Sequence, residues 1–222
     1  MARPQIDQDA VREQLFLAAE DHLRNHGAVT VSISDIAAAC GMAQSNFYRF
    51  FESKEAFYEA LAGRWFEELN TIMETVVAAD LSPRDKLYAF FARRLALKRA
   101  RHAEDPDLFA TYLEIGDEHW EVIRGYVDLA DHYMAQILGE AMNAGHFPGF
   151  ELDHLVALVN LMVQPFCNPK VMVKMERTAQ EANLAIVIDT LFAGLRRADT
   201  GRGDDEAGSV VPLSASRLYA AG

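Results

Sequence analysis

The chain has 222 residues, half of them hydrophobic and 24% charged, a composition typical of a globular protein with one large domain or two small ones. Its formal net charge of −12 gives no support to nucleic-acid binding through bulk charge. No apolar run approaches the roughly 18 to 20 residues needed to span a bilayer. The first residues, MARPQIDQDAVREQ, lack the apolar segment of a secretion signal. We therefore expect a cytoplasmic protein with no membrane partner.

The two cysteines, Cys40 and Cys167, lie far apart and form no C-x-x-C pair. This spacing predicts neither a disulfide framework nor a zinc site. We interpret both thiols as small buried hydrophobes, and we expect no cofactor.

Apolar residues recur at three- and four-residue spacing along almost the whole chain, and no alternating strand pattern is convincing. We therefore predict an all-α protein of about nine helices. The first helix is expected from about Asp9 to His26. Ser32, with Asp35 three residues later, resembles a capping box that opens a short helix ending at Gly41. A third short helix is expected over residues 44–50.

Ser53 can cap a fourth, long helix, and about five more helices follow it. We expect breaks between them near residues 80–86, 104–107, 116–120, 143–149 and 164–170. Residues 152–163 are apolar nearly all round, which predicts a helix covered on more than one side. The last helix is expected from about Glu181 to Ala198. The Gly-, Ser- and Asp-rich residues 200–222 that follow predict a flexible tail.

The two short helices, joined by a Gly-containing turn after a longer helix, have the arrangement of a helix-turn-helix unit. At 100° per residue, one side of the third helix carries Ala43, Phe47, Phe50 and Phe51, and the other carries Gln44, Ser45, Tyr48 and Arg49. Gln and Ser can contact base edges, and Arg and Tyr can hold phosphate. Lys54 adds a cation in the first turn of the next helix. The same side chains would also suit a solvated helical hairpin with no DNA partner.

Residues 31–61, VSISDIAAACGMAQSNFYRFFESKEAFYEAL, resemble the DNA-binding segment of the TetR family of bacterial transcriptional regulators. The matching residues are Ile36, Ala37, Gly41, Tyr48, Phe51, Ser53, Lys54, Glu55 and Ala56. The resemblance implies a helix-turn-helix DNA-binding domain over residues 1–52 and an effector-binding and dimerisation domain over residues 53–199. It also implies a ligand-responsive repressor that binds a near-palindromic operator as a homodimer and is released by a small effector, and the apolar candidates for the pocket favour a hydrophobic one.

By position, the resemblance assigns contacts with bases and nearby backbone to Gln44, Ser45 and Asn46. It assigns phosphate contacts to Tyr48, Lys54 and Ser32, and Arg49 joins them by its chemistry. The family often has Lys at position 44, His at position 50 and Pro at position 52, where this chain has Gln44, Phe50 and Glu52. Residues 1–64 carry six Lys and Arg and nine Asp and Glu, a net charge of −3. These departures bear on affinity and on the operator sequence.

Large apolar or amphipathic residues in the second domain are candidates for the effector pocket that the resemblance implies. They are Trp65, Phe66, Phe90, Phe109, Tyr112, Trp120, Tyr126, Met134, Met162 and Phe166, with His102 and His132 as polar anchors. The same residues would also suit a packed core. Candidates for the dimer interface, in the last two long apolar helices, are Leu155, Leu158, Leu184, Val187, Ile188 and Leu191.

Two other classes of function remain open at this point. A helical-bundle enzyme with a di-iron site needs two Glu-x-x-His motifs, and only Glu151 and His154 fit. His22 and His26 could share a metal, but no Glu follows His22 as in H-E-x-x-H, so we expect no metal site and no enzyme. A helical interaction module that does not bind DNA is the second alternative, and the acidic first domain favours it.

Overall fold

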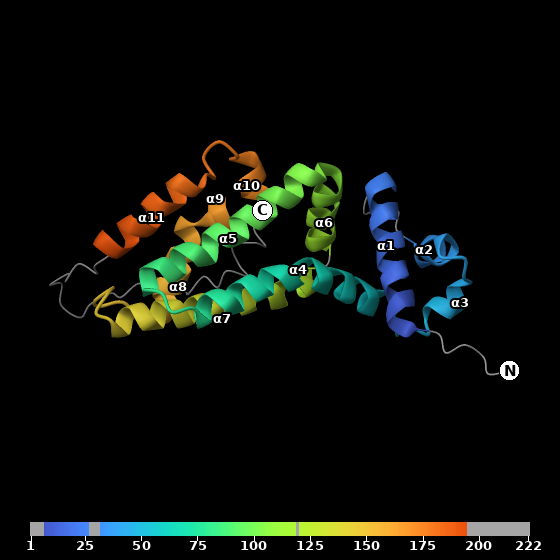
Figure 1. The fold of residues 1–222 in the computed structure, drawn as a ribbon, viewed down its shortest axis with the longest axis horizontal. Helices are drawn as coiled ribbons and strands as arrows, with labels where there is room; N and C mark the ends of the chain where they lie inside the picture. Colours follow the sequence, from blue (N-terminus) through green and yellow to red (C-terminus); the bar gives the residue numbers. More distant parts are fainter. Residues whose placement is uncertain (1–6, 27–31, 119, 195–222) are drawn as a thin grey trace, which may run out of the picture. The chain divides into compact units, whose positions relative to one another are not determined.

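The computed structural model describes residues 7–26, 32–118 and 120–194, and every regular element in these ranges is a helix (Figure 1). The prediction of an all-α protein is confirmed. Eleven helices are described: α1 (Gln8–His26), α2 (Ile33–Ala39), α3 (Gln44–Phe47), α4 (Lys54–Ala78), α5 (Pro83–Glu104), α6 (Pro106–Glu118), α7 (Trp120–Asn143), α8 (Leu152–Met162), α9 (Gln164–Cys167), α10 (Pro169–Lys174) and α11 (Glu181–Gly194). The tail predicted for residues 200–222 lies outside the described residues.

The helix count exceeds the expected nine because a predicted break, residues 164–170, contains the short helix α9 and the start of α10. Proline ends a preceding helix because it has no N–H to donate, yet it fits the first turn of a new one. Pro165 and Pro169 occupy such first-turn positions in α9 and α10. The Asn168 side chain also caps α10 by accepting hydrogen bonds from the backbone N–H groups of Lys170, at 3.0 Å, and Val171, at 3.4 Å.

The chain divides into two compact units. Unit 1 comprises residues 1–67 and 101–123, and unit 2 comprises residues 68–100 and 124–222. Within unit 1, α1 contacts both α2 and α6, and α2 contacts α3. The side chains where these helices meet form one apolar cluster, which fixes the position of the short helix α3.

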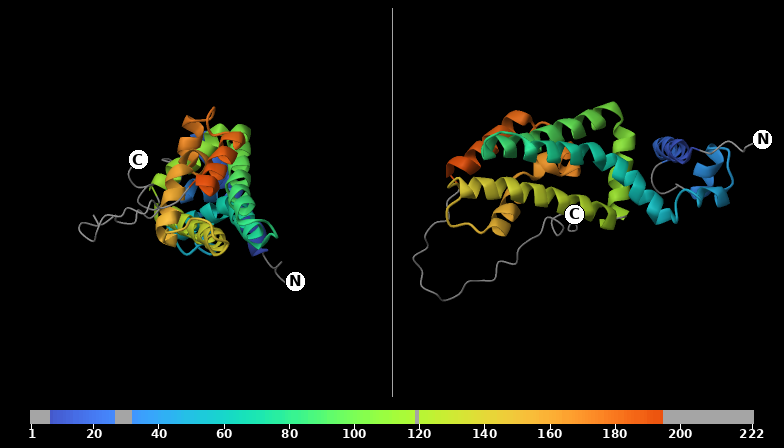
Figure 2. Two further views of the ribbon diagram at one scale, coloured as in Figure 1. Left: turned by 90° about the vertical axis from the view of Figure 1, so that its left-hand side faces the viewer. Right: turned by 60° about the horizontal axis from the view of Figure 1, so that its bottom comes forward.

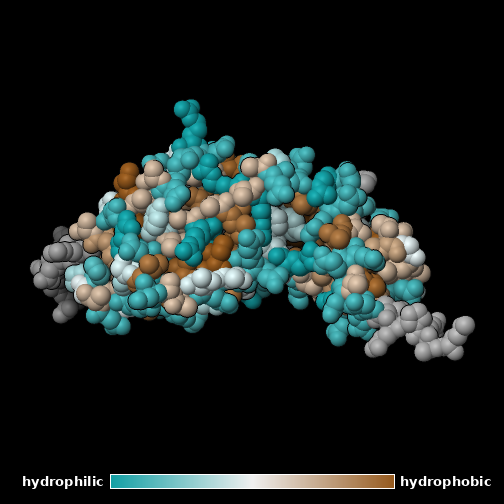
Figure 3. Space-filling view, in the orientation of Figure 1, coloured by the Kyte–Doolittle hydropathy of each residue, from teal (hydrophilic) through white to brown (hydrophobic). Residues whose placement is uncertain are grey.

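Unit 2 is a helical bundle, and its long helices α5 and α7 lie roughly alongside the part of α4 that belongs to it (Figure 2). Its buried core takes residues from every described helix of the unit, among them Met73, Leu95, Met134, Leu155, Met172 and Ile188. Apolar residues also reach its surface in patches between polar ones (Figure 3). None of the described helices combines the length and the apolar character that crossing a lipid bilayer requires.

Candidate nucleic-acid interface

The short helix α2 is fixed at both ends by its own local sequence. The Ser32 side chain accepts a hydrogen bond from the backbone N–H of Asp35 at 3.1 Å, and its hydroxyl donates to the Asp35 carboxylate at 2.6 Å. At the other end Gly41 adopts a φ of 68°, which other residues rarely tolerate. The N–H groups of Gly41 and Met42 then donate to the carbonyls of Ala38 and Ala37. This pattern is a Schellman motif, which turns the chain sharply toward α3.

The exposed side chains of α3 and of the turn after it are those predicted to contact DNA. Gln44, Ser45, Asn46, Tyr48 and Arg49 are all exposed. The α-helix ends at Phe47 rather than at Phe50, because the N–H groups of Arg49 and Phe50 donate three residues back and tighten the last turn. The short helix therefore presents a compact set of polar groups to solvent.

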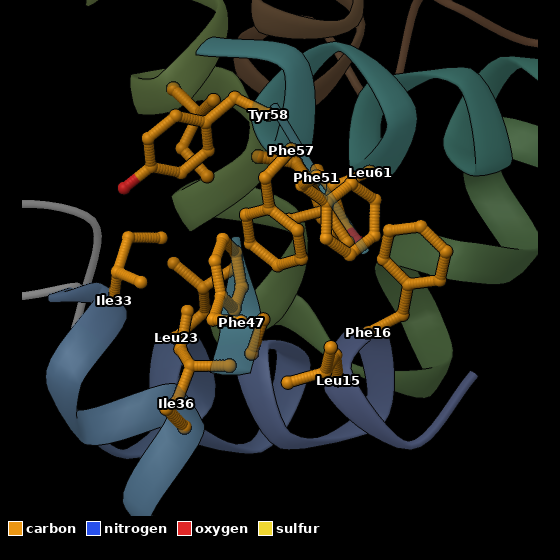
Figure 4. Packing of buried hydrophobic residues seen from close by; sticks show 14 residues of the cluster. Leu15, Phe16, Leu23, Ile33, Ile36, Phe47, Phe51, Phe57, Tyr58 and Leu61 are labelled. Carbon is orange, nitrogen blue, oxygen red and sulfur yellow. The ribbon is translucent and has the colours of Figure 1, made fainter. Parts of the chain in front are cut away.

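Phe47 and Phe51, beside these polar groups, point the other way, into the core (Figure 4). Phe47 is 0% exposed and Phe51 4%, whereas Phe50 is half-buried. The ring of Phe57, from α4, lies 5.2 Å from that of Phe47 and 4.9 Å from that of Phe51, both edge-to-face. Such aromatic pairs add about 0.5–1.5 kcal/mol each beyond their buried area. The exposed polar side of α3 thus packs, through Phe47, on a cluster of phenylalanine rings.

Arg12, on α1, also holds this region, although no sequence pattern points to it. Its guanidinium donates to the carbonyl oxygen of Phe50 at 2.9 Å and lies 4.3 Å above the ring of Phe51. The two hydrogen-bond partners are 38 residues apart in sequence, so no local pattern connects them. The contact fastens the end of α3 to α1, and we regard Arg12 as a positioning residue rather than a DNA contact.

The start of α4 forms the second edge of the site. The Ser53 hydroxyl accepts a hydrogen bond from the N–H of Ala56 at 3.0 Å and caps the helix, as the sequence indicates. Lys54 is exposed, and its ammonium lies 5.3 Å from the centre of the Tyr58 ring. Glu52 is exposed between the turn and this lysine and places a negative charge at the same edge.

Three of the six Lys and Arg side chains in residues 1–64 are held by contacts inside unit 1. Besides Arg12, Arg24 donates to Asp105 at 2.6 Å, and Arg64 pairs with Glu13. The Arg24 contact also lowers the pKa of the Asp105 carboxyl. Arg3 lies outside the described residues. This leaves Arg49 and Lys54, both exposed, as the described cations that unit 1 can offer to phosphate through this segment.

Four of the six effector-pocket candidates of unit 1 form one aromatic group. The ring of Trp65 is stacked on that of Tyr112, with centroids 4.2 Å apart, and Phe109 lies 5.6 Å from Trp65 and 5.2 Å from His102. Tyr112 donates to the Glu20 carboxylate on α1 at 3.2 Å, and burial, with Glu20 beside it, raises the pKa of its hydroxyl. Phe66 and Trp120 are half-buried in the same unit. The structure thus brings four of these six candidates into contact.

The remaining candidates lie in unit 2, which also buries two cations that no sequence pattern points to. Phe90, Met134 and Phe166 are buried, Tyr126 and Met162 are half-buried, and His132 is exposed. These two buried cations are Arg94 and Lys98 of α5. Arg94 donates to the hydroxyl of Tyr126 at 2.8 Å. Among the described residues, no group of three or more His, Cys, Asp or Glu side chains could hold a metal ion.

Four of the predicted dimer-interface residues are already buried within a single protomer. Leu155, Leu184 and Ile188 are 0% exposed and Leu191 is 1% exposed, whereas Leu158 and Val187 are half-buried. The large apolar side chains that α8 and α11 do expose are Leu161, at 58%, and Ile186, at 63%.

Comparison with known proteins places both parts of the chain in one family. The model described as "Bacterial regulatory proteins, tetR family" matches residues 15–61, and the one described as "Tetracyclin repressor-like, C-terminal domain" matches residues 83–188. A search of curated proteins found no match.

Solved structures share the fold at low sequence identity. SmeT, the repressor of the Stenotrophomonas maltophilia multidrug efflux pump SmeDEF, is 19% identical with a TM-score of 0.64, over 84% of this chain and 91% of SmeT. FadR from Bacillus subtilis, solved in complex with stearoyl-CoA, is 20% identical with a TM-score of 0.57, over 82% of this chain and 98% of FadR. PfmR from Thermus thermophilus is 19% identical with a TM-score of 0.55, over 83% of this chain and all of PfmR. Taken with the motif of residues 31–61 and the helix-turn-helix geometry, the two family matches show that this chain belongs to the TetR family of bacterial transcriptional regulators.

Proposed function

We propose that the protein is a repressor that binds a near-palindromic operator as a homodimer and leaves it when a small effector binds in the bundle. The observation that supports this most directly is that α3 and the turn after it have one polar, exposed face and one apolar, buried face. Five polar side chains point to solvent there, while Phe47 and Phe51 anchor the same segment in the core. A short helix held this way can enter a major groove without losing its own structure.

The exposed residues divide by the kind of DNA contact that they can make. Gln44 is placed to read an adenine edge, with Ser45 and Asn46 beside it for base or backbone contacts. Tyr48, Arg49 and Lys54 suit phosphate oxygens. Ser32 can also contact phosphate, but its hydroxyl already donates to Asp35, so it would have to exchange that partner.

Dimerisation through α8 and α11 would cover the apolar side chains that these helices expose. Leu161 and Ile186 would lie at its centre, and the half-buried Leu158 and Val187 would border them. A two-fold dimer would present two copies of α3 about one DNA turn apart, roughly 34–36 Å, which calls for two symmetric half-sites.

The effector would act by binding better to a conformation in which the spacing of the two α3 helices does not match the half-sites of the operator. By linkage, operator DNA must weaken effector binding by the same factor. Within unit 1, the contact between Tyr112 on α6 and Glu20 on α1 would pass a shift of α6 to α1, which contacts α2.

A gel-shift assay with DNA that flanks the protein's own gene tests the proposal. We expect a retarded complex at low salt that competing non-specific DNA does not remove. Absence of binding at low salt, with or without cell extract as a source of effector, would refute the regulator function. It would favour an interaction module, which the −3 net charge of residues 1–64 already supports.

A further inference from the structure

Helix α5 carries two buried cations one helical turn apart in the interior of unit 2. Arg94 is 5% exposed and Lys98 is 4% exposed. Taking such charges out of water costs several kcal/mol per ion unless opposite charge compensates them. Because they are four residues apart on one helix, the two side chains lie on the same face.

Lys98 contacts neutral oxygens. Its ammonium donates to the carbonyls of Cys167, at 2.6 Å, and Phe166, at 3.4 Å, at the end of α9. No carboxylate of the residues described in the structure lies within ion-pair distance of it. Burial, together with the neighbouring charge of Arg94, lowers the pKa of Lys98 to about 7. An ammonium has three N–H donors, so one donor remains available to a further acceptor.

Arg94 lies beside two aromatic rings. Its guanidinium donates to the Tyr126 hydroxyl at 2.8 Å and lies 4.7 Å from the Phe90 ring and 5.7 Å from the Tyr126 ring. This setting suits a ligand whose apolar body packs against rings while its charged end meets the guanidinium.

A third buried cation on the same helix, Lys86, differs from Lys98 because it pairs with a carboxylate. Lys86, 8% exposed, donates to the Glu140 carboxylate at 2.8 Å and to the carbonyl of Val77 at 2.9 Å. Lys86 thus forms an ion pair with a carboxylate of the same unit. Lys98, which is buried more deeply, forms no such pair with any described residue.

We propose that Arg94 and Lys98 bind the carboxylate of an acidic effector, whose apolar body packs among Phe90, Tyr126 and Phe166. A carboxylate would compensate the charge of Lys98 with one oxygen, and its second oxygen could accept a hydrogen bond from the guanidinium of Arg94. A phosphate dianion fits less well because the cost of desolvation rises steeply with charge. The inference rests on the proposed function, since it names the chemical class of effector that the bundle accepts.

Three matched pairs of probes test the proposal: benzoate with benzamide, octanoate with octanamide, and dodecanoate with dodecanamide. Each is added to the full chain without DNA, the melting temperature is recorded, and binding is measured by calorimetry. We expect at least one carboxylate to raise Tm while its amide does not, because a ligand that binds only the native state stabilises it. If no carboxylate raises Tm, or each amide acts as its acid does, the proposal fails.

Variants locate the binding site. We expect Arg94→Met and Lys98→Met each to weaken the binding of the active carboxylate at least about tenfold, whereas Lys86→Met, which removes a buried lysine paired with Glu140, leaves it within about twofold. If Lys98→Met does not fold, Arg94→Met and the charge-conserving Arg94→Lys decide, since Arg94→Lys should retain more affinity. Equal binding by wild type and Arg94→Met would overturn the proposal, as would tighter binding of octyl phosphate than of octanoate.

Because these measurements need no DNA, their failure is distinguishable from failure of the proposed function. A gel shift without carboxylate binding would leave the repressor proposal standing and remove only the acidic effector. Carboxylate binding without a gel shift would support the carboxylate site and remove the repressor proposal.

Discussion

The cations of the two proposed binding sites lie in opposite settings. In unit 1, the cations beside α3, Arg49 and Lys54, are exposed, and the buried cluster of that unit includes Phe47, Phe51 and Phe57. In unit 2, α5 buries Lys86, Arg94 and Lys98. Cations on a surface suit a large polyanion that stays in solvent, whereas buried cations suit a small anion that leaves solvent. The two proposals thus depend on the position of charge rather than on its amount, in a chain whose net charge is −12.

Removal of a buried phenylalanine ring beneath α3 has the largest expected effect on stability. Phe47→Ala should destabilise unit 1 by about 3–5 kcal/mol, because the ring is fully buried and its removal leaves a cavity between Phe51 and Phe57. DNA binding should fall with it. Urea unfolding followed by circular dichroism measures the loss, and Phe50→Ala, at a half-buried ring, is the control. A Phe47→Ala variant as stable as wild type would mean that the rings do not hold α3.

The buried cations of unit 2 predict a dependence of stability on pH. The native pKa of Lys98, about 7, lies below its unfolded value of 10.5, so between these values the unfolded state binds the extra proton and stability rises with pH. We expect wild type to gain on the order of 2 kcal/mol relative to Lys98→Met between pH 6.5 and 9. Urea midpoints of both proteins at the two pH values measure this gain. A constant difference would show that Lys98 keeps its proton throughout, and Lys86→Met is the control.

Gln44→Ala tests base reading on the surface of unit 1. A bidentate contact with one base is worth about 1–3 kcal/mol of discrimination, so its loss should relax the sequence preference at one position of each half-site. Selection from a randomised DNA pool, with wild type and variant in parallel, reveals the change. The assignment of Gln44 to a base is wrong if both preference and affinity stay as in wild type.

Tyr48→Phe and Lys54→Ala should have the smallest effects, a loss of affinity that is similar for all sequences. With Arg49 and Lys54 from each protomer, a dimer neutralises about four phosphates, and log K should fall with log[salt] at a slope of about −3.6. Lys54→Ala removes two of these contacts and should flatten the slope by about two, whereas Tyr48→Phe leaves it unchanged. Anisotropy titrations at several salt concentrations give these slopes. A slope much steeper than about −3.6 would reveal further cations at the interface.

Local sequence patterns predict the ends of α2 and the buried side of the segment that contains α3. Ser32 and Gly41 end α2 through hydrogen bonds to residues within five positions, so a short stretch of sequence contains all the information. The inward direction of Phe47 and Phe51 follows from helical spacing. Arg12 could not be found in this way, because its contact with Phe50 depends on how α1 packs.

Unit 2 was harder to predict because its helices are apolar on several sides. In α8 and α11 the spacing of Leu155 and Leu184 indicates burial, but it does not tell the protomer's own core from a subunit interface. The assignment of the dimer contacts therefore stays a prediction. The segment ARRLALKRARH, which contains Arg94 and Lys98, resembles a solvated helix face. Only the packing of α5 against neighbouring segments reveals that both cations are buried.

The most direct test of operator binding is DNase I footprinting of the DNA that flanks the protein's gene, at low salt. We expect one protected segment containing two symmetric half-sites whose centres are about one helical turn apart. Protection without two-fold symmetry, or no protection at any protein concentration that keeps the chain soluble, would contradict it.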